Sequence, residues 1–391
     1  MRMLFTFVGG SGHFEPLLPI AQAARAAGHT VAFACSPSMV ATVENSAFTV
    51  FAIGTSSGQP PERRPLLAVD MEREERDLRE GFARDGARFR APVILALCAE
   101  WQPDVVVYDE TDFGSAIAAE RLGLPHATVL VIAAGSFVRK DVLGDALDEV
   151  RAEHSLPPDP ELAMLSRYLV LSPFPPSYRD PAFPLPATGH AFRSRVVDIS
   201  AHEAAPSWLA NLPAAPSVYF TLGTIFNLES GDLFTRVLTG LRDLPINLIV
   251  TVGRHIDPAE FGPQPANIHI ERFIPQAAIL PRCNAVVSHG GSGSVMGTLA
   301  HGLPAVLLPM GADQPLNAAR CADLGVAQVL DPLTATPEIV REAVTTVLTD
   351  ARYSQAAQRL QAEITALPGP EHAVDLLERL AIEKLPIRAR P

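Results

Sequence analysis

A histidine follows a glycine-rich turn close to the start of the chain. The segment Gly9–His13 (GGSGH) lies between an apolar run and the first helical pattern. An imidazole in that place can be neutral near pH 7 and accept a proton from a substrate hydroxyl. The positive end of a helix dipole disfavours the imidazolium form and therefore favours a base. The sequence predicts His13 as a general base, and capping of its own helix is the alternative.

Two known glycine motifs fail at this turn. The dinucleotide pattern G-x-G-x-x-G would start at Gly10, but Glu15 stands where a small residue is required, and its carboxylate would repel a pyrophosphate. The hydrolase pattern G-x-S-x-G would need a glycine in place of His13. We therefore interpret the glycines, including Gly12 in a loop for the acceptor, as residues that let the backbone approach a ligand.

A base of this kind usually has a carboxylate that orients it. Asp109 directly follows the expected strand Val105–Tyr108, so it should lie at the carboxyl end of that strand. Ligands of open α/β sheets bind beyond these ends. We predict Asp109 as the partner of His13. Glu110 and Asp112 are the alternatives, and helix capping is the non-catalytic interpretation.

A second glycine-rich turn lies in the other half of the chain. The strand-like run Ala285–Ser288 leads into HGGSGS, residues 289–294, and a helical pattern follows. Free N–H groups at the start of a helix bind phosphate. This arrangement predicts a diphosphate site, with the hydroxyls of Ser292 and Ser294 and the imidazole of His289 as further donors. A Walker A loop is excluded because no Gly-Lys-Ser/Thr follows, and an esterase would need a G-x-S-x-G elbow that we do not find.

Polar residues also follow the expected strand Ala305–Leu308. Asp313 and Gln314 would stand together beyond its end. Their oxygens and amide hydrogens suit the hydroxyls of a sugar. A plain helix N-cap is the alternative for both residues.

Composition limits the partners. The 391 residues carry a formal net charge of −12 without a long basic run, which argues against an extended nucleic-acid or anionic-membrane surface. The apolar runs are far shorter than the roughly 20 residues that cross a bilayer, and the N-terminus lacks a signal-peptide cleavage pattern. The four cysteines are far apart, as expected of a reduced cytoplasmic protein without disulfides or a zinc site. We expect a small partner.

Strand-like apolar runs alternate with helical patterns, which is typical of parallel α/β architecture. The strands expected in the first half are Met3–Val8, Thr30–Ala34, Val105–Tyr108, Ala127–Ile132 and Tyr168–Leu171. Those expected in the second half are Val218–Leu222, Asn247–Val252, Ile268–Ile270, Ala285–Ser288, Ala305–Leu308 and Ala327–Leu330.

Three segments outside these strands affect the organisation. The proline-rich stretch Pro173–Pro186 should form neither a helix nor a central strand, and we expect the connection between the halves within about Leu185–Pro216. The charged segment Gln59–Arg90 begins irregularly and continues as a helix, which we interpret as solvated, with a lid or acceptor loop as the alternative. A C-terminal helix is expected around Glu371–Ile382.

Together these segments resemble the inverting, nucleotide-sugar-dependent glycosyltransferases of the GT-B fold, most closely the bacterial branch that decorates natural products. The resemblance covers nearly the whole chain and is strongest between Arg272 and Leu330. There, RFIPQAAIL, VVSHGGSGSVMGTLAHGLPAVLLPMGADQPLNA and AARCADLGVA look like the donor signature of that family in the right order. The N-terminal segment GGSGHFEPLLPIAQAARAAGHTV is similar to the first strand, loop and helix of the family.

The resemblance implies a role for each matching position. His13 would be the base and Asp109 its partner. The residues implied for the donor are Gly223 and Thr224 near the phosphates, His289, Gly291, Ser292, Gly293 and Ser294 on the diphosphate, Asp313 and Gln314 on the sugar, and Phe273, Ile274 and Gln276 around the nucleobase. Phe273 stands where tryptophan is common in the family, and its smaller ring would stack less tightly on a base.

The implied fold is GT-B, with two Rossmann-like, doubly wound α/β domains that face each other across a cleft. We expect an acceptor-binding domain over 1–200, a nucleotide-sugar-binding domain over 201–370, and a C-terminal helix over 371–391 that packs back on the first domain. The implied reaction moves a sugar from a dTDP- or UDP-linked donor to a hydroxyl, or to nitrogen or carbon, of a small hydrophobic natural product, with inversion and without metal or cofactor. A sugar-nucleotide epimerase and a non-catalytic binding protein are the alternatives, and the sequence leaves open whether the chain forms a homodimer.

Overall fold

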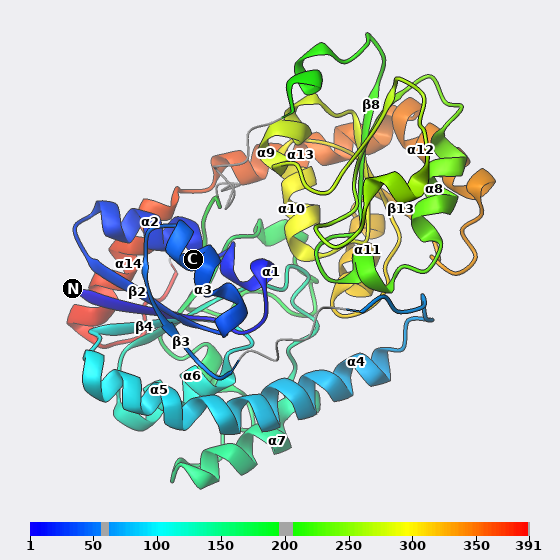
Figure 1. Cartoon of the computed structure of the whole chain (residues 1–391). Helices are drawn as coiled ribbons and strands as arrows, with labels where there is room; N and C mark the ends of the chain where they lie inside the picture. Colours follow the sequence, from blue (N-terminus) through cyan, green and yellow to red (C-terminus); the bar gives the residue numbers. More distant parts are fainter. Residues whose placement is uncertain (56–61, 195–205, 390–391) are drawn as a thin grey trace. The chain divides into compact units, whose positions relative to one another are not determined.

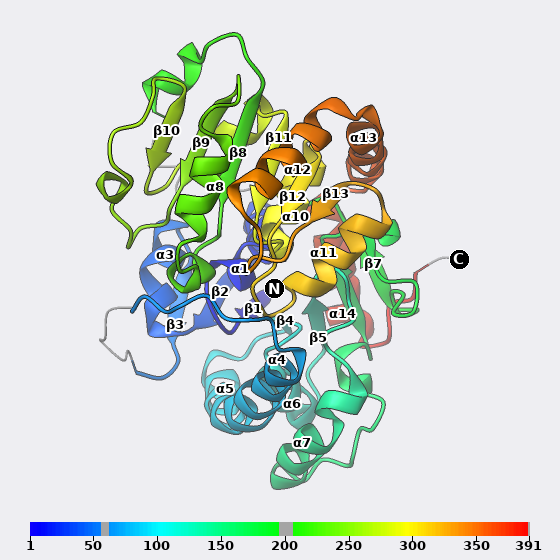
Figure 2. The same cartoon turned by 90° about the vertical axis from the view of Figure 1, so that its right-hand side faces the viewer.

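The computed structural model describes residues 1–55, 62–194 and 206–389. These residues form two compact units, drawn in Figures 1 and 2. Unit 1 contains residues 1–55, 71–194 and 366–389, and unit 2 contains residues 62–70 and 206–365. Each unit is built on one parallel β-sheet, which confirms the expected doubly wound α/β class.

The sheet of unit 1 has seven strands in the order β3-β2-β1-β4-β5-β6-β7. The strands are β1 (Arg2–Thr6), β2 (Thr30–Cys35), β3 (Thr49–Ala52), β4 (Val105–Asp109), β5 (His126–Val129), β6 (Leu169–Ser172) and β7 (Gly189–Ala191). All neighbouring pairs are parallel. Strand β4 is buried along its whole length, as expected when helices cover both faces of a sheet.

Helices cover both faces of this sheet. The α-helices of this unit are α1 (Ser11–Phe14), α2 (Leu18–Ala26), α3 (Val40–Asn45), α4 (Met71–Asp77), α5 (Ala87–Trp101), α6 (Phe113–Leu122), α7 (Lys140–Glu153) and α14 (Pro370–Glu383). A π-helical stretch, Leu78–Gly86, joins α4 to α5. In Figure 1, α2 and α14 lie on one face of the sheet, and α5 and α6 lie on the other. The C-terminal helix α14 thus packs against α2 within unit 1.

The sheet of unit 2 has six parallel strands in the order β10-β9-β8-β11-β12-β13. They are β8 (Ser217–Thr221), β9 (Asn247–Thr251), β10 (Ile268–Glu271), β11 (Ala285–Ser288), β12 (Ala305–Leu307) and β13 (Ala327–Val329). The helices are α8 (Leu233–Leu241), α9 (Gln276–Ile279), α10 (Ser292–Ala300), α11 (Gln314–Asp323), α12 (Pro337–Thr349) and α13 (Ala351–Ala366). Helices α8 and α12 pack together over a core that includes Val218, Phe220 and Leu248.

The structure adds two strands that the sequence did not predict. Strand β3 is a short edge strand with no fully buried residue, so it lacks a strong apolar signal. Strand β7 has three residues and lies within the segment expected to connect the halves. It is the other edge of the sheet and pairs only with β6. Residues 195–205 of that expected connection, with the predicted domain boundary at 200, lie outside the described residues.

Residues 62–70 belong to unit 2, although we expected them in the first domain. The N–H of Arg64 donates to the carbonyl of Leu228 at 2.8 Å, and the guanidinium of Arg63 pairs with Glu260 at 2.7 Å. Leu66 packs against the core of unit 2. The second unit also ends earlier than expected, at 365 instead of 370. The helix expected within Gln59–Arg90 is confirmed and begins at Met71.

Two other observations bear on sequence expectations. All four cysteines are buried and free. Among the residues that the structure describes, no helix has the length and apolar character needed to cross a bilayer.

Candidate active site

The topology of unit 1 brings His13 and Asp109 to one point of the sheet. Strands β1 and β4 are neighbours at the position where the strand order reverses, with Thr6 paired to Tyr108. Ligands of doubly wound sheets bind at such a switch point, beyond the carboxyl ends of the strands. His13 lies in α1 just after β1, and Asp109 is the last residue of β4.

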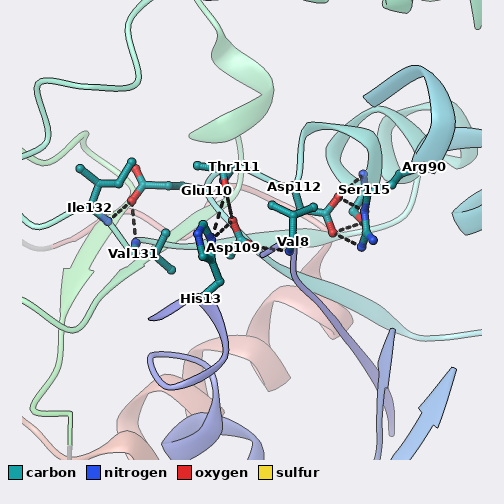
Figure 3. Close-up of polar contacts among 10 residues, drawn as sticks. All are labelled: Val8, His13, Arg90, Asp109, Glu110, Thr111, Asp112, Ser115, Val131 and Ile132. Carbon is teal, nitrogen blue, oxygen red and sulfur yellow. Dashed lines mark hydrogen bonds and ion pairs between the residues drawn. The ribbon is translucent and has the colours of Figure 1, made fainter. Parts of the chain in front are cut away.

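Figure 3 shows the contacts of the two side chains. His13 Nδ1 lies 3.4 Å from Asp109 Oδ1 and 3.3 Å from the hydroxyl of Thr111. The Asp109 carboxylate is fully buried and accepts hydrogen bonds from the N–H of Val8 at 2.7 Å, and from the N–H and the hydroxyl of Thr111 at 2.7 and 2.6 Å. Burial alone would raise the pKa of Asp109, but His13 and these hydrogen bonds hold it below its usual value.

A glycine makes room for the His13 ring. Gly9 has a φ of +79°, and a Cβ at this position would lie 2.8 Å from His13 Cδ2. The His13 side chain keeps 26% of its surface exposed, whereas Asp109 has none exposed. The ring therefore combines a buried anionic partner with access to a substrate. The N-cap of α1 is Gly10, without a side-chain capping bond, and the ring instead contacts Thr111 and Asp109.

The two alternative carboxylates point elsewhere (Figure 3). Glu110 accepts the N–H groups of Val131 and Ile132, both at 2.6 Å, and burial raises its pKa to about 7. Asp112 forms a two-bond pair with the buried Arg90 at 2.9 and 2.6 Å and caps α6. Both carboxylates therefore bind other parts of the fold, and Asp109 is the carboxylate that lies beside His13.

A cavity of about 230 Å³ lies next to this site within unit 1. Its lining residues are Val8, Gly81, Phe82, Gly86, Ala87, Arg90, Thr111, Asp112, Phe113 and Gly114. The π-helical stretch supplies one wall. Thr111 lines the cavity and also bonds to His13, so a molecule in the cavity lies close to the histidine.

Unit 2 repeats the topological arrangement. Strands β8 and β11 are neighbours where the strand order reverses, with Thr221 paired to Ser288. Gly223 follows β8 and His289 follows β11. A Cβ on Gly223 would lie 2.7 Å from His289 Nε2, and a Cβ on Gly291 would lie 2.6 Å from the same atom. Two glycines therefore border the ring of His289.

The environment of His289 keeps its imidazole neutral. Burial lowers its pKa to about 4, and its Nδ1 is buried without a hydrogen-bond partner. A neutral ring has one N–H donor and one acceptor. His289 can therefore donate one hydrogen bond to a phosphate oxygen, but it does not bring a positive charge at neutral pH.

The turn continues into helix α10, whose first residues match the predicted phosphate cradle. Its N-cap is Gly291, without a side-chain capping bond, and the first N–H groups of any α-helix lack intrahelical acceptors. The hydroxyl of Ser292 donates to Asp313 Oδ2 at 2.7 Å, and Asn317 donates to both of these groups. The hydroxyl proton of Ser292 is thus directed to Asp313 in this structure, and the role of Ser292 on a phosphate stays a prediction. Gly293 is exposed and Ser294 is half-buried.

The expected sugar-binding pair, Asp313 and Gln314, lies at the start of α11. Asp313 is half-buried at the N-cap of α11 without a side-chain capping bond. Gln314 is buried, and its Oε1 accepts the N–H of Met310 at 2.8 Å. The oxygen of Gln314 is thus bonded to the backbone in this structure, and the role of Gln314 on a sugar stays a prediction.

The residues expected around the nucleobase lie between the end of β10 and the start of α9 in unit 2. Phe273 is half-buried, and the Arg254 guanidinium lies 4.7 Å from its ring centroid. The side chain of Ile274 is buried in an apolar cluster, so only its backbone could contact a base. Gln276 begins α9, and Thr224 is exposed after β8.

Sequence reasoning missed Thr111, Arg90 and Asn317. The contacts of these residues are with other segments of the chain. Thr111 contacts His13, and Arg90 pairs with Asp112. Asn317 donates hydrogen bonds to Gly290, Ser292 and Asp313. A Thr two residues after an expected catalytic Asp is a recognisable local signal, because such residues often bond back to the carboxylate.

The chain is similar to known proteins over nearly its whole length. Residues 87–223 match the N-terminal domain, and residues 235–380 the C-terminal domain, of the family described as erythromycin biosynthesis protein CIII-like. The chain is 31% identical to 10-deoxymethynolide desosaminyltransferase of Streptomyces venezuelae, over 98% of each protein. It is 30% identical to tylactone mycaminosyltransferase of Streptomyces fradiae, over 97% of this chain and 92% of that protein.

A solved structure of similar fold agrees with this similarity in sequence. Spinosyn rhamnosyltransferase SpnG matches with a TM-score of 0.83 and 25% identity, over 97% of this chain and all of that chain (100%). The match confirms the GT-B fold, and the relatives named as glycosyltransferases favour that activity over the epimerase and the non-catalytic alternative. The chain therefore belongs to the erythromycin biosynthesis protein CIII-like family of natural-product glycosyltransferases.

Proposed function

We propose that this enzyme transfers a sugar from a dTDP-linked donor to a hydroxyl of a hydrophobic natural product, with inversion and with His13 as general base. The observation that carries the proposal is the partly exposed His13 ring beside the buried, ionised Asp109 at the switch point of unit 1. Solved structures of SpnG contain thymidine diphosphate in one case and spinosyn aglycone in another, which favours dTDP over UDP here.

Unit 2 would bind the donor. The first-turn N–H groups of α10 and the positive end of its dipole suit a diphosphate. The neutral His289 would add one N–H donor, and Thr224 an exposed hydroxyl. These groups stabilise the charge that develops on the leaving diphosphate. We propose that they do so without a metal ion, so chelators should leave turnover unchanged.

Unit 1 would activate the acceptor. His13 takes the proton of the acceptor hydroxyl as its oxygen bonds to the anomeric carbon. The bond from that carbon to the diphosphate oxygen breaks, and the nucleoside diphosphate leaves with the electron pair. A single displacement from the opposite face inverts the anomeric centre. The cavity beside Thr111 would hold the apolar body of the acceptor near His13.

Calorimetry would test the donor site. The protein is titrated with dTDP, UDP and NAD without added metal, as wild type, His289→Ala and His255→Ala. His255 is an exposed histidine in unit 2 and serves as the control. We expect dTDP to bind to wild type and to His255→Ala, and to bind much more weakly to His289→Ala. We expect no binding of NAD. Equal binding of dTDP to both variants would remove His289 from the site, and binding of NAD alone would reject the donor assignment.

A further inference from the structure

The hydroxyl of Thr111 stands between the proposed base and its carboxylate. Its oxygen lies 2.6 Å from Asp109 Oδ1 and 3.3 Å from His13 Nδ1 (Figure 3). The residue is 3% exposed, and its own N–H also donates to Asp109 Oδ1 at 2.7 Å. The side chain and backbone of Thr111 are therefore fixed by the same carboxylate.

The direction of these bonds follows from proton counting. An ionised carboxylate only accepts hydrogen bonds, so the single hydroxyl proton of Thr111 is directed to Asp109. The hydroxyl oxygen can then only accept a hydrogen bond from an N–H at His13 Nδ1. An imidazole that donates from Nδ1 keeps its lone pair, and thus its basicity, on Nε2.

We propose that Thr111 is a positioning residue of the transfer reaction, whose hydroxyl holds His13 in the Nδ1-protonated tautomer and makes Nε2 the basic nitrogen. This inference rests on the proposed role of His13. The direct distance from His13 Nδ1 to Asp109 is 3.4 Å, longer than a strong charge-assisted bond of about 2.7–2.9 Å. The Thr111 hydroxyl, 2.6 Å from Asp109 Oδ1 and 3.3 Å from His13 Nδ1, is a second acceptor for the Nδ1 proton and links the carboxylate to the ring.

The neighbouring residues hold Thr111 in this place. Asp112, the next residue, is bound by Arg90 and caps α6, and Glu110, the previous residue, is bound by the N–H groups of Val131 and Ile132. Both neighbours are thus anchored by groups outside the His13 site. Three consecutive side chains before α6 fix the loop, and only Thr111 is directed to His13.

Nuclear magnetic resonance of the full-length protein tests the proposal directly. Histidine is labelled with nitrogen-15, and the His13 signals are identified by their loss in His13→Gln. Two-bond proton–nitrogen spectra distinguish the two neutral tautomers. The variants are Thr111→Val, which keeps the shape and the backbone N–H, and Thr111→Ser, which also keeps the hydroxyl. A thermal melt verifies that both variants fold.

We expect Nδ1-protonated His13 in wild type and in Thr111→Ser. In Thr111→Val the ratio of the tautomers should shift toward Nε2–H by about tenfold, the change expected for the loss of one hydrogen bond. An unchanged ratio in Thr111→Val, or a ratio in Thr111→Ser that shifts as much, would overturn the proposal. Because the spectra do not depend on turnover, this result is separate from the test of His13 as the base: full turnover in His13→Gln would reject the base, whatever the tautomer.

Discussion

Gly223 and His289 are in contact at the switch point of unit 2, although 65 positions separate them in the sequence. A Cβ on Gly223 would lie 2.7 Å from both Cε1 and Nε2 of the histidine ring. Since Gly223 also has a φ of +75°, the position requires glycine for two reasons. The glycine before the exposed Thr224 therefore sets the position of the His289 ring.

Gly223→Ala should consequently weaken the binding of dTDP, because the new methyl group displaces the His289 ring. Gly262→Ala is the matched control: Gly262 has a φ of +68° in the same unit, but a Cβ there would meet nothing within 4 Å. Both variants should lose a similar amount of stability from backbone strain. Calorimetry should then show weaker dTDP binding in Gly223→Ala alone, and equal binding by both variants would contradict the role given to this contact.

The pair of Arg90 and Asp112 should stabilise unit 1 strongly. Arg90→Leu leaves a buried carboxylate without its cation, which typically destabilises a protein by about 3–5 kcal/mol. Arg88 lies on α5 like Arg90, but it forms an exposed ion pair with Glu153 of α7. Arg88→Ala removes this pair and should change stability little. Denaturant unfolding measures both. If the two variants unfold at the same denaturant concentration, the buried pair does not stabilise the protein as proposed.

Glu110 should make stability depend on pH. Its folded pKa of about 7 lies above the usual 4.5, so the folded state binds more protons between these values. Stability should therefore be complete below pH 4.5, fall as the pH rises to about 7, and stay low above it, a decline on the order of 3 kcal/mol. Glu110→Gln keeps an Oε1 for Val131 and Ile132 but cannot ionise.

The measurement is denaturant unfolding of wild type and Glu110→Gln between pH 4.5 and 8. Glu110→Gln should lack this part of the decline, and Glu44→Gln, at an exposed glutamate, should retain it. A decline of the same size in Glu110→Gln would show that another group causes it.

The size of the cavity should decide which acceptors fit. Gly81 lines it, and a Cβ there would meet no atom within 4 Å. Gly81→Leu should therefore fill part of the cavity without strain and raise the KM for large acceptors, while dTDP binding stays the same. Gly86→Ala should instead destabilise the π-helical stretch, because its Cβ would lie 2.8 Å from the carbonyl oxygen of Gly81. An unchanged KM in Gly81→Leu would place the acceptor elsewhere.

The sequence predicted best what local patterns determine. Strands ending at Asp109 and Ser288, and the glycine turns before His13 and after His289, are recognisable from neighbouring residues, and parallel topology brings their ends together. The orientation of side chains was less predictable. Gln314 follows a strand end as expected, but its oxygen turns inward to Met310, a choice that depends on packing.

Features set by distant contacts were not predictable at all. Residues 62–70 belong to unit 2 because the N–H of Arg64 donates to the carbonyl of Leu228, and Leu66 packs against the core of unit 2. The cavity arises where the π-helical stretch, α5 and the loop before α6 meet, and no single segment contains its pattern.

The most direct test of the central claim is the turnover of His13→Ala with a dTDP-sugar and an accepted hydroxyl substrate, compared with wild type and His255→Ala. We expect His13→Ala to lose about 10²–10⁴-fold in kcat, the usual contribution of a general base, while it binds dTDP as wild type does. The exposed His255 should be replaceable without effect. Full turnover by His13→Ala would contradict the account, because another group would then have to remove the proton from the acceptor.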